Sequence, residues 1–202
     1  MTALILLVED NPALRDAWSD TLTQQGYTVR NTGDAIEALA QARQEPRPQL
    51  AMLDLGLPPK PGDSAVGLEL LRQLVLEIPG IKAIILTGQD EAAVSWRAIE
   101  LGAFDFLLKP ASRAQVLQAF KRAEMFLATE RQLALAGQAR ITLTAPIREG
   151  VKEFGEAAQE RLVRGVLADS AFNVAQAARK LGVTREHLYY FIKKFGIERA
   201  VP

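Results

Sequence analysis

The chain of 202 residues contains no cysteine, which excludes disulfide bonds, zinc–thiolate sites and thiol-based catalysis. It has no run of eighteen apolar residues and no charged-then-apolar leader after Met1. We therefore expect neither a membrane span nor secretion, and we expect a cytoplasmic protein. A Gly-x-x-x-x-Gly-Lys-Ser/Thr loop is absent as well, so the sequence predicts no P-loop nucleotide site.

Neither sign of charge is in excess, because 24 basic residues balance 24 acidic residues. Residues 1–140 carry fourteen Lys and Arg against seventeen Asp and Glu, whereas residues 141–202 carry ten against seven. An excess this small in the tail is compatible with an ordinary solvated surface. With 49% apolar residues, the length suits one domain of ordinary size followed by a smaller one.

Short apolar runs alternate with helical patterns over the first two thirds of the chain. Each run has the length and composition of a strand buried on both faces, which is typical of a parallel sheet. Five strand-then-helix repeats predict an α/β fold with a doubly wound five-stranded parallel sheet. The expected strands are 3–8, 27–31, 49–53, 82–86 and 104–107, and the expected helices are 12–25, 34–44, 65–77, 90–101 and 111–130.

Polar residues follow four of these apolar runs, namely Glu9 with Asp10, then Asp54, Thr87 and Lys109. In an open parallel sheet, residues at the carboxyl ends of strands line the functional crevice. Carboxylates crowded together repel each other, and the repulsion favours protonation unless a divalent cation holds them ionised. Mg²⁺ suits this role because it prefers oxygen ligands. Lys109 offers a positive charge and Thr87 a hydroxyl donor to a phosphoryl group. The pattern predicts a Mg²⁺-binding, phosphate-handling pocket.

The acidic pair has a plainer interpretation when taken alone. Such a pair after a strand is more often a helix cap or a solvated turn. Asn11 followed by Pro12 has the sequence of an N-cap with proline at the first helical position. The conjunction of four matched strand ends favours the phosphate pocket.

Four segments carry a resemblance to a known family: Val8-Glu9-Asp10-Asn11, Leu53-Asp54-Leu55, Leu86-Thr87-Gly88, and the run from Gly102 to Lys109-Pro110. Through them, residues 1–130 resemble the receiver domain of two-component response regulators. The resemblance implies that Asp54 accepts a phosphoryl group from a histidine kinase. It also implies that Asp10, Asp54 and the Gly56 carbonyl bind Mg²⁺ directly. Glu9 then acts through a metal-bound water.

The resemblance also implies a switch. Thr87 and Lys109 are expected to contact the phosphoryl oxygens, and Phe106 occupies the aromatic position that rotates inward when Thr87 moves. Taken alone, Phe106 indicates only a core position. Its place three residues before Lys109-Pro110 is what favours the switch.

One departure from the receiver pattern follows the expected phosphoacceptor. Pro58 has its usual place, but a longer stretch than usual, with Pro59 and Pro61 in it, precedes Gly67. The prolines stiffen this loop. It resembles the loop in a subset of nitrogen-regulator (NtrC) relatives, so we interpret it as a family variant.

The tail predicts a helix-turn-helix arrangement. An amphipathic helix ending near Asp169 is followed by a short helix at about 173–180 and a turn at Leu181-Gly182-Val183. Thr184 is a good N-cap for a last helix, 185–194. Within that helix, Tyr189 and Phe191 are expected to face the core.

Residues 173–189 and 193–197 resemble the Fis-type helix-turn-helix that ends NtrC-family activators. The resemblance implies duplex DNA as a partner, with the last helix in the major groove. The basic residues usual after Tyr189 are replaced by Tyr190 and Phe191. Two outcomes are open: weaker affinity for the phosphate backbone than in relatives, or a Tyr190 that stacks or hydrogen-bonds in place of a cation. The implied DNA-binding residues are Thr184, Arg185, Glu186, His187, Tyr190, Lys193 and Lys194.

Some of these residues keep an alternative role. Arg185 suits a bidentate contact to guanine and equally a clamp on phosphate. Lys193 and Lys194 suit contacts to the DNA backbone or solvated helix ends. His187, the only histidine, is more often an incidental polar contact than a phosphorelay or metal residue.

We divide the chain into a receiver domain (1–130), a linker (131–148) and a Fis-type DNA-binding domain (149–202). Helical spacing continues toward Arg140, with core packing up to Leu127 and a connector beyond it. The predicted function is a phosphorylation-controlled transcriptional regulator that is not an enzyme and works without ATP-driven remodelling of polymerase.

A homodimer is expected, because one helix-turn-helix reads too few base pairs to be specific. Phosphorylation is expected to tighten it through the receiver face near Phe106. The first tail helix is expected to form the dimer contact, with burial inside its own domain as the alternative. Its apolar stripe consists of Phe154, Leu162, Val163, Val166 and Leu167.

Two other classes fit part of the pattern. A Mg²⁺-dependent phosphatase with an aspartyl-phosphate intermediate also needs clustered carboxylates and a lysine. Phosphatases of the haloacid dehalogenase group carry Asp-x-Asp after the first strand, and Glu9-Asp10-Asn11 does not match it. The second class is a phosphorylation-controlled adaptor whose helical tail binds protein or RNA.

Overall fold

The computed structural model describes residues 3–58, 64–88, 92–136, 138 and 150–197, and it divides into two compact units, Met1–Phe126 and Leu127–Pro202. Helix α5 (Arg113–Leu135) occupies the start of the segment that the sequence predicts as a linker. Residues 59–63 of the long loop, 137 and 139–148 of the predicted linker, and residue 149 lie outside the described residues. None of the described helices is both long and apolar enough to cross a membrane.

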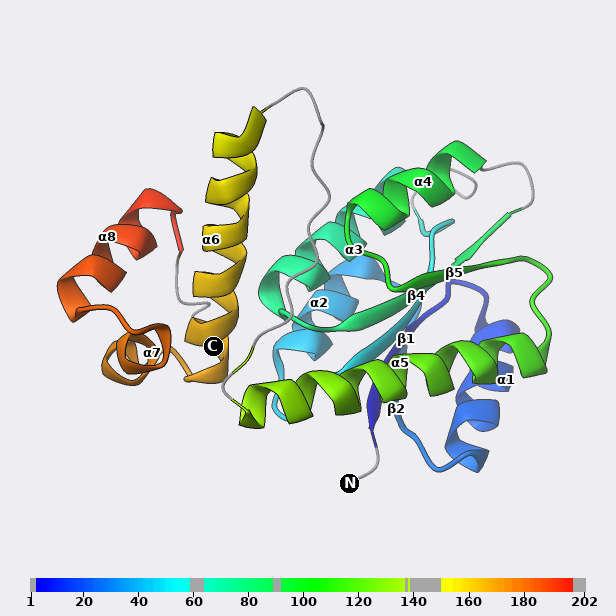
Figure 1. Ribbon diagram of the computed structural model, residues 1–202. Helices are drawn as coiled ribbons and strands as arrows, with labels where there is room; N and C mark the ends of the chain where they lie inside the picture. Colours follow the sequence, from blue (N-terminus) through cyan, green and yellow to red (C-terminus); the bar gives the residue numbers. More distant parts are fainter. Residues whose placement is uncertain (1–2, 59–63, 89–91, 137, 139–149, 198–202) are drawn as a thin grey trace. The chain divides into compact units, whose positions relative to one another are not determined.

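The first unit contains a five-stranded sheet in the order β2-β1-β3-β4-β5, and all its pairs are parallel (Figure 1). This confirms the predicted α/β fold. Strands β2 to β5 end one residue later than predicted, so Asp54 and Thr87 are themselves the last residues of their strands. The strands are β1 (Leu4–Val8), β2 (Thr28–Thr32), β3 (Leu50–Asp54), β4 (Lys82–Thr87) and β5 (Asp105–Leu108).

Helices cover both faces of the sheet. Leu6 and Val8 of β1 pack in one core with residues of α2, α3 and α4. Successive side chains of a strand point to opposite faces, so the buried Ile5 and Leu7 belong to the other face. Helices α1 and α5 cover that face (Figure 1). Burial on both faces explains why the β1 run is continuously apolar. The other helices of this unit are α1 (Pro12–Gln24), α2 (Ala35–Arg43), α3 (Ala65–Glu77) and α4 (Ala92–Glu100).

The strand order places a crevice between β1 and β3. From β1 the chain continues to β2 on one side, and from β3 it continues to β4 on the other. Where the order reverses in this way, the adjoining helices lie on opposite faces and leave a crevice at the carboxyl ends of the two strands. Glu9 and Asp10 follow β1 at this crevice, and Asp54 ends β3 beside them.

The long loop after β3 returns to a tight contact at the start of α3. A Cβ atom on Gly67 would lie 2.5 Å from the Leu55 Cα and 2.7 Å from the Leu55 carbonyl oxygen. Only glycine therefore lets the first turn of α3 pack against the chain that leaves Asp54.

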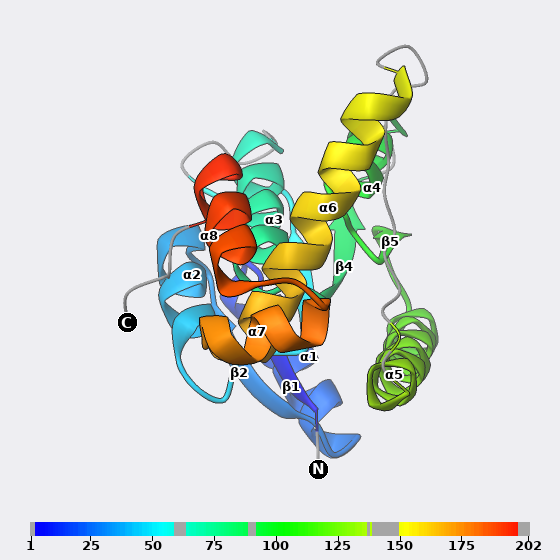
Figure 2. The same cartoon turned by 60° about the vertical axis from the view of Figure 1, so that its left-hand side comes forward.

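The second unit contains α6 (Gly150–Asp169), α7 (Val174–Leu181) and α8 (Arg185–Lys194), which pack against one another (Figure 2). These bounds agree with the predicted helix-turn-helix. Asn173 and Thr184 cap the last two helices, and Gly182 takes the left-handed conformation that the turn between them requires, with φ of 66°. The core combines residues of all three helices: Val163, Leu167, Ala177, Ala178, Leu188 and Ile197.

The Gly67–Leu55 contact predicts that Gly67→Ala destabilises the first unit. Overpacking against backbone costs about 1–3 kcal/mol of unfolding free energy. At a helix position with open space, Gly→Ala would instead raise the unfolding free energy by about 1 kcal/mol. A lower unfolding free energy therefore identifies the close contact. Urea unfolding followed by tryptophan fluorescence measures this unit, because both tryptophans, Trp18 and Trp96, belong to it.

Gly88→Ala is the control, because a Cβ atom there would meet nothing within 4 Å. We expect it to change the unfolding free energy by less than about 0.5 kcal/mol. A Gly67→Ala protein as stable as the wild type would mean that α3 does not need this close approach.

Candidate functional site

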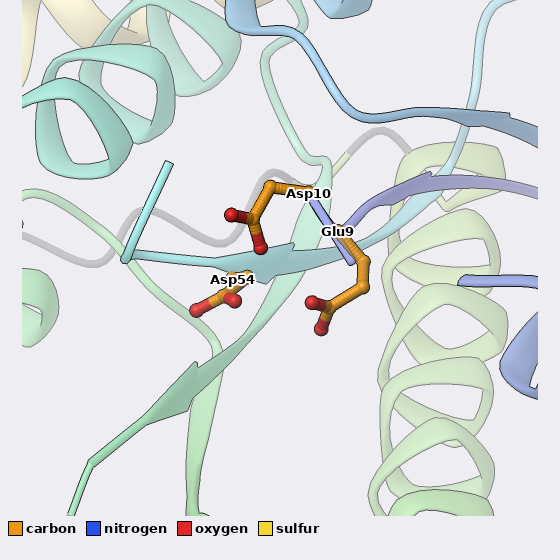
Figure 3. A group of neighbouring side chains, drawn as sticks. All are labelled: Glu9, Asp10 and Asp54. Carbon is orange, nitrogen blue, oxygen red and sulfur yellow. The ribbon is translucent and has the colours of Figure 1, made fainter. Parts of the chain in front are cut away.

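Three carboxylates converge at the crevice between β1 and β3 (Figure 3). Oxygens of Glu9, Asp10 and Asp54 all lie within 4.8 Å of one another. Glu9 and Asp54 are only 2% and 7% exposed, and Asp10 is half-buried. The structure thus brings together the three acidic residues that the sequence places at strand ends.

Lys109 joins this cluster from the end of β5. Its Nζ lies 2.5 Å from Asp54 Oδ2 and 3.5 Å from Glu9 Oε2. The Lys109 backbone N–H donates to the Thr87 carbonyl oxygen at 2.7 Å, which continues the β4–β5 pairing and fixes where the lysine leaves the sheet. Thr87 is buried at the end of β4. All four strand ends therefore meet at one edge.

The carboxylates of the cluster carry more negative charge than Lys109 balances, as the directions of the pKa shifts indicate. Burial, then the charge of Asp54, raises the pKa of Glu9, and Lys109 opposes this only in part. Burial disfavours the Lys109 ammonium, but its hydrogen bond to Asp54 and the charges of Asp54 and Glu9 outweigh burial and raise the pKa of Lys109. The lysine is therefore held charged, and the carboxylates can accept further positive charge.

The donor set fits a hard divalent cation. Carboxylate oxygens are the ligands that Mg²⁺ prefers, and two of the three carboxylates here are buried too deeply for water alone to solvate them. Gly56 lies beside the cluster, because its backbone N–H donates to Asp54 Oδ1 at 3.0 Å. The residues that could hold the cation are Glu9, Asp10, Asp54 and Gly56.

The N-cap interpretation of the β1–α1 segment is correct for Asn11 and does not exclude the site. The Asn11 side chain accepts hydrogen bonds from the N–H groups of Ala13 and Leu14, and Pro12 begins α1. Glu9 Oε1 accepts from the Asn11 N–H at 3.3 Å. Because Asn11 does the capping, the carboxylates of the preceding pair remain in the cluster.

Sequence reasoning missed Arg15. Its Nη1 donates to the carbonyl oxygens of Glu9 at 2.8 Å and Asp10 at 3.4 Å, so the guanidinium holds the backbone that carries both carboxylates. A Cβ atom on Gly33 would lie 2.6 Å from this Nη1, so glycine leaves room for it. The available signal was a basic residue one helical turn after the Asn11 cap.

Phe106 lies on the surface. Its side chain is 36% exposed on β5, the edge strand of the sheet, so the plain core interpretation is wrong. Beside the acidic cluster, a recess of about 380 Å³ is lined in part by Glu9 and Lys109. The rest of its lining is apolar: Leu14, Trp18, Leu86, Pro110 and Ala111.

In the second unit, all of the predicted DNA-binding residues are exposed, on α8 or at its N-cap. The Thr184 hydroxyl accepts from the His187 N–H at 3.2 Å, which confirms the predicted N-cap. Lys194 Nζ, however, lies 3.0 Å from Glu156 Oε1 of α6. The exposed residues are Thr184, Arg185, Glu186, His187, Tyr190, Lys193 and Lys194.

One expectation about this unit needs correction. The sequence places Tyr189 in the core, but it is 58% exposed, because its neighbour Leu188 takes the core position and the next residue is turned about 100° around the helix. Phe191 is half-buried against the core, as predicted. The apolar stripe of α6 is used mainly inside its own domain, where Val163 and Leu167 are buried.

Of the other stripe residues, Val166 packs against the same core and Leu162 is half-buried. The side chain of Phe154 lies outside the described residues. Burial within one domain therefore accounts for Val163 and Leu167, and a dimer contact through this helix stays a prediction.

Comparison with known proteins agrees with this geometry. The chain matches the family described as "Response regulator receiver domain" over residues 5–121 and the family described as "Bacterial regulatory protein, Fis family" over residues 156–195. The nitrogen assimilation regulatory protein NtrX of Azorhizobium caulinodans is 32% identical over 129 residues, 64% of this chain and 28% of that protein. The probable transcriptional regulatory protein TcrX of Mycobacterium tuberculosis is 32% identical over 56% of this chain and 46% of that protein.

Solved structures give the same result. A receiver domain protein (CheY-like) from Methanospirillum hungatei is 30% identical with a TM-score of 0.55, over 60% of this chain and 93% of that one. NtrX from Brucella abortus is 26% identical with a TM-score of 0.61, over 78% of this chain and 34% of that one. The chain spans less than half the length of both NtrX proteins and of TcrX. Because the receiver match covers more than half of the chain, the chain belongs to the response regulator receiver domain family.

Proposed function

We propose that this protein is a phosphorylation-controlled DNA-binding regulator of transcription in a two-component system, acting in the cytoplasm without enzymatic turnover of its own. One observation carries the proposal: Lys109 Nζ lies 2.5 Å from Asp54 Oδ2 inside a cluster of carboxylates, on a chain that also carries a helix-turn-helix unit. The NtrX and TcrX relatives, both named as regulatory proteins, support it.

Asp54 is the phosphoacceptor in this proposal. One of its carboxylate oxygens bonds to phosphorus while the bond from phosphorus to the imidazole nitrogen of a kinase histidine breaks. Lys109 is already at that carboxylate and contacts the phosphoryl oxygens, together with the Thr87 hydroxyl. Asp10, Asp54 and the Gly56 carbonyl would hold a Mg²⁺ ion directly, Glu9 would act through water, and the ion would supply further positive charge against those oxygens.

The recess beside the cluster supports docking of a kinase. Its apolar lining lies next to Glu9 and Lys109, and Leu14 at its edge is 45% exposed. A partner that covers these side chains would bring its histidine to the carboxyl ends of the strands. Excluding water there also strengthens the charge interactions at Asp54.

Phosphorylation changes the face formed by α4, β5 and α5. The phosphoryl group adds about −1.5 to −2 charges at Asp54, and Thr87 and Lys109 move toward it. Phe106, which is 36% exposed on β5, rotates into the space that Thr87 leaves. A bistable aromatic residue of this kind gives the phosphate a way to bias a distant surface.

Exposed apolar side chains support a dimer on that face. Trp96 of α4 is 70% exposed, Leu108 of β5 is 50% exposed and Met125 of α5 is 70% exposed. Apolar groups gathered on one surface mark interaction sites. Two helix-turn-helix units then bind half-sites about one helical turn apart, which gives an inverted-repeat operator.

Within the DNA-binding unit, Arg185 is the contact to base edges, because the first residues of a recognition helix reach them. The hydroxyl of Thr184 and the side chains of Glu186 and His187 lie beside it at the start of α8. Lys193 is the contact to the DNA backbone. Lys194 can share that role only after its ion pair with Glu156 breaks. Breaking a surface ion pair costs about 1 kcal/mol or less.

The assignment of Asp54 is tested by incubation with acetyl phosphate and Mg²⁺, followed by mass spectrometry of the intact protein. We expect the wild type to gain one phosphate and Asp54→Asn to gain none, and EDTA should prevent the gain. Asp20→Asn is the matched control, because Asp20 is exposed on α1 outside the cluster, and it should be modified like the wild type. Stable phosphorylation of Asp54→Asn at another residue would contradict the assignment.

The two classes of DNA contact are separated by measuring affinity against salt concentration. Lys193→Ala should weaken binding to specific and random duplexes alike and reduce the salt slope by nearly one unit. Arg185→Ala should cost about 1–3 kcal/mol, mainly on the specific site. Equal losses on both duplexes for Arg185→Ala would make this residue a phosphate clamp instead.

A further inference from the structure

Four aromatic rings form a connected group along α8 and its C-terminal end. His187 stacks on Phe191, with ring centroids 4.8 Å apart, and Phe191 stacks on Phe195 at 5.8 Å. Tyr190 meets Phe191 edge to face at 5.5 Å and lies 6.1 Å from His187. Because Phe191 and Phe195 pack against the domain core, the group is anchored there.

Tyr190 is both exposed and held in place. Its side chain is 56% exposed, yet two rings of the anchored group contact it. Tyr189 is similarly exposed, at 58%, and no ring contact of this residue is found in the part of the chain that the structure describes. A ring that is already ordered loses less conformational freedom on binding. A contact to a ligand therefore costs less conformational entropy at Tyr190 than at Tyr189.

Tyr190 lies on the face of α8 that enters the groove in the proposed complex. It is one helical turn after Glu186 and three residues before Lys193, so the three residues share one side of the helix. Its phenol ring carries no charge to neutralise a phosphate. The apolar group that a base presents in the major groove is the C5-methyl of thymine, which aromatic and other apolar side chains contact.

We propose that Tyr190 is a specificity-determining residue whose ring contacts the C5-methyl group of a thymine in the binding site. This inference rests on the proposed DNA binding. A hydrogen bond from the Tyr190 hydroxyl to a phosphate is the competing contact, and it would act on all sequences alike. The ring contact instead produces a preference for thymine over uracil, which differ only in that methyl group.

The test uses the full chain and a duplex selected from a random pool, with each thymine of the site replaced in turn by uracil. For the wild type, one replacement in each half-site should weaken binding about fourfold, the effect of losing one buried methyl group. Tyr190→Phe should keep this preference because it keeps the ring. Tyr190→Ala should lose it. Tyr189→Ala is the control and should keep it.

Three outcomes would overturn the inference. The first is that uracil at every position leaves wild-type binding unchanged, and the second is that Tyr190→Ala retains the fourfold preference. The third is that Tyr190→Phe loses affinity on specific and random duplexes alike, which identifies the phosphate contact. If the wild type binds no duplex even at low salt, the proposed DNA-binding function fails and this inference fails with it. The uracil series leaves the protein unaltered, so its result does not depend on the folding of a variant.

Discussion

The ion pair between Lys109 and Asp54 is the interaction on which the first unit depends for its proposed chemistry. It joins the ends of β5 and β3, two strands separated by β4, at the edge where Glu9 and Asp10 leave β1. Parallel pairing brings these strand ends to one edge, and the reversal of strand order between β1 and β3 opens the crevice there. The site is thus a consequence of the sheet topology.

Contacts with the surrounding backbone hold the carboxylates in position. Arg15 binds the carbonyl oxygens of the acidic pair, and Gly67 lets α3 approach Leu55 just after Asp54. These contacts fix the two chain segments that carry the carboxylates. In the proposed mechanism Lys109 is the partner that moves, because its long side chain can leave Asp54 for a phosphoryl oxygen without moving either segment. This division between fixed carboxylates and a movable cation suits a site that must respond to phosphate.

Much of the fold and of the acidic site could be predicted from the sequence, because buried parallel strands produce continuous apolar runs with a polar residue at each end. That regularity alone is enough to locate Asp54 and Lys109. Arg15 escaped prediction because its partners are backbone carbonyls, which have no sequence signature. The contact of Gly67 with Leu55 escaped for a similar reason, since it depends on how closely two backbones approach in space.

The second unit was predictable in its helices but less so in its surfaces. Caps and a glycine turn fixed the bounds of α7 and α8. Tyr189 lies on the exposed side of α8 because Leu188, and not its neighbour, takes the core position. The apolar pattern alone did not determine which of the two faces the core. The apolar pattern of α6 suits its own core and a partner equally well, and the structure places Val163 and Leu167 in the core.

The central claim is that phosphate on Asp54 controls assembly on DNA. Sedimentation velocity of the full chain with a fluorescent duplex carrying its selected site tests this directly, with and without acetyl phosphate and Mg²⁺. We expect a complex of two chains on one inverted repeat that forms at lower protein concentration after phosphorylation. Asp54→Asn should not respond. A phosphorylated protein that binds as one chain per duplex, with the affinity of the unmodified protein, would contradict this claim.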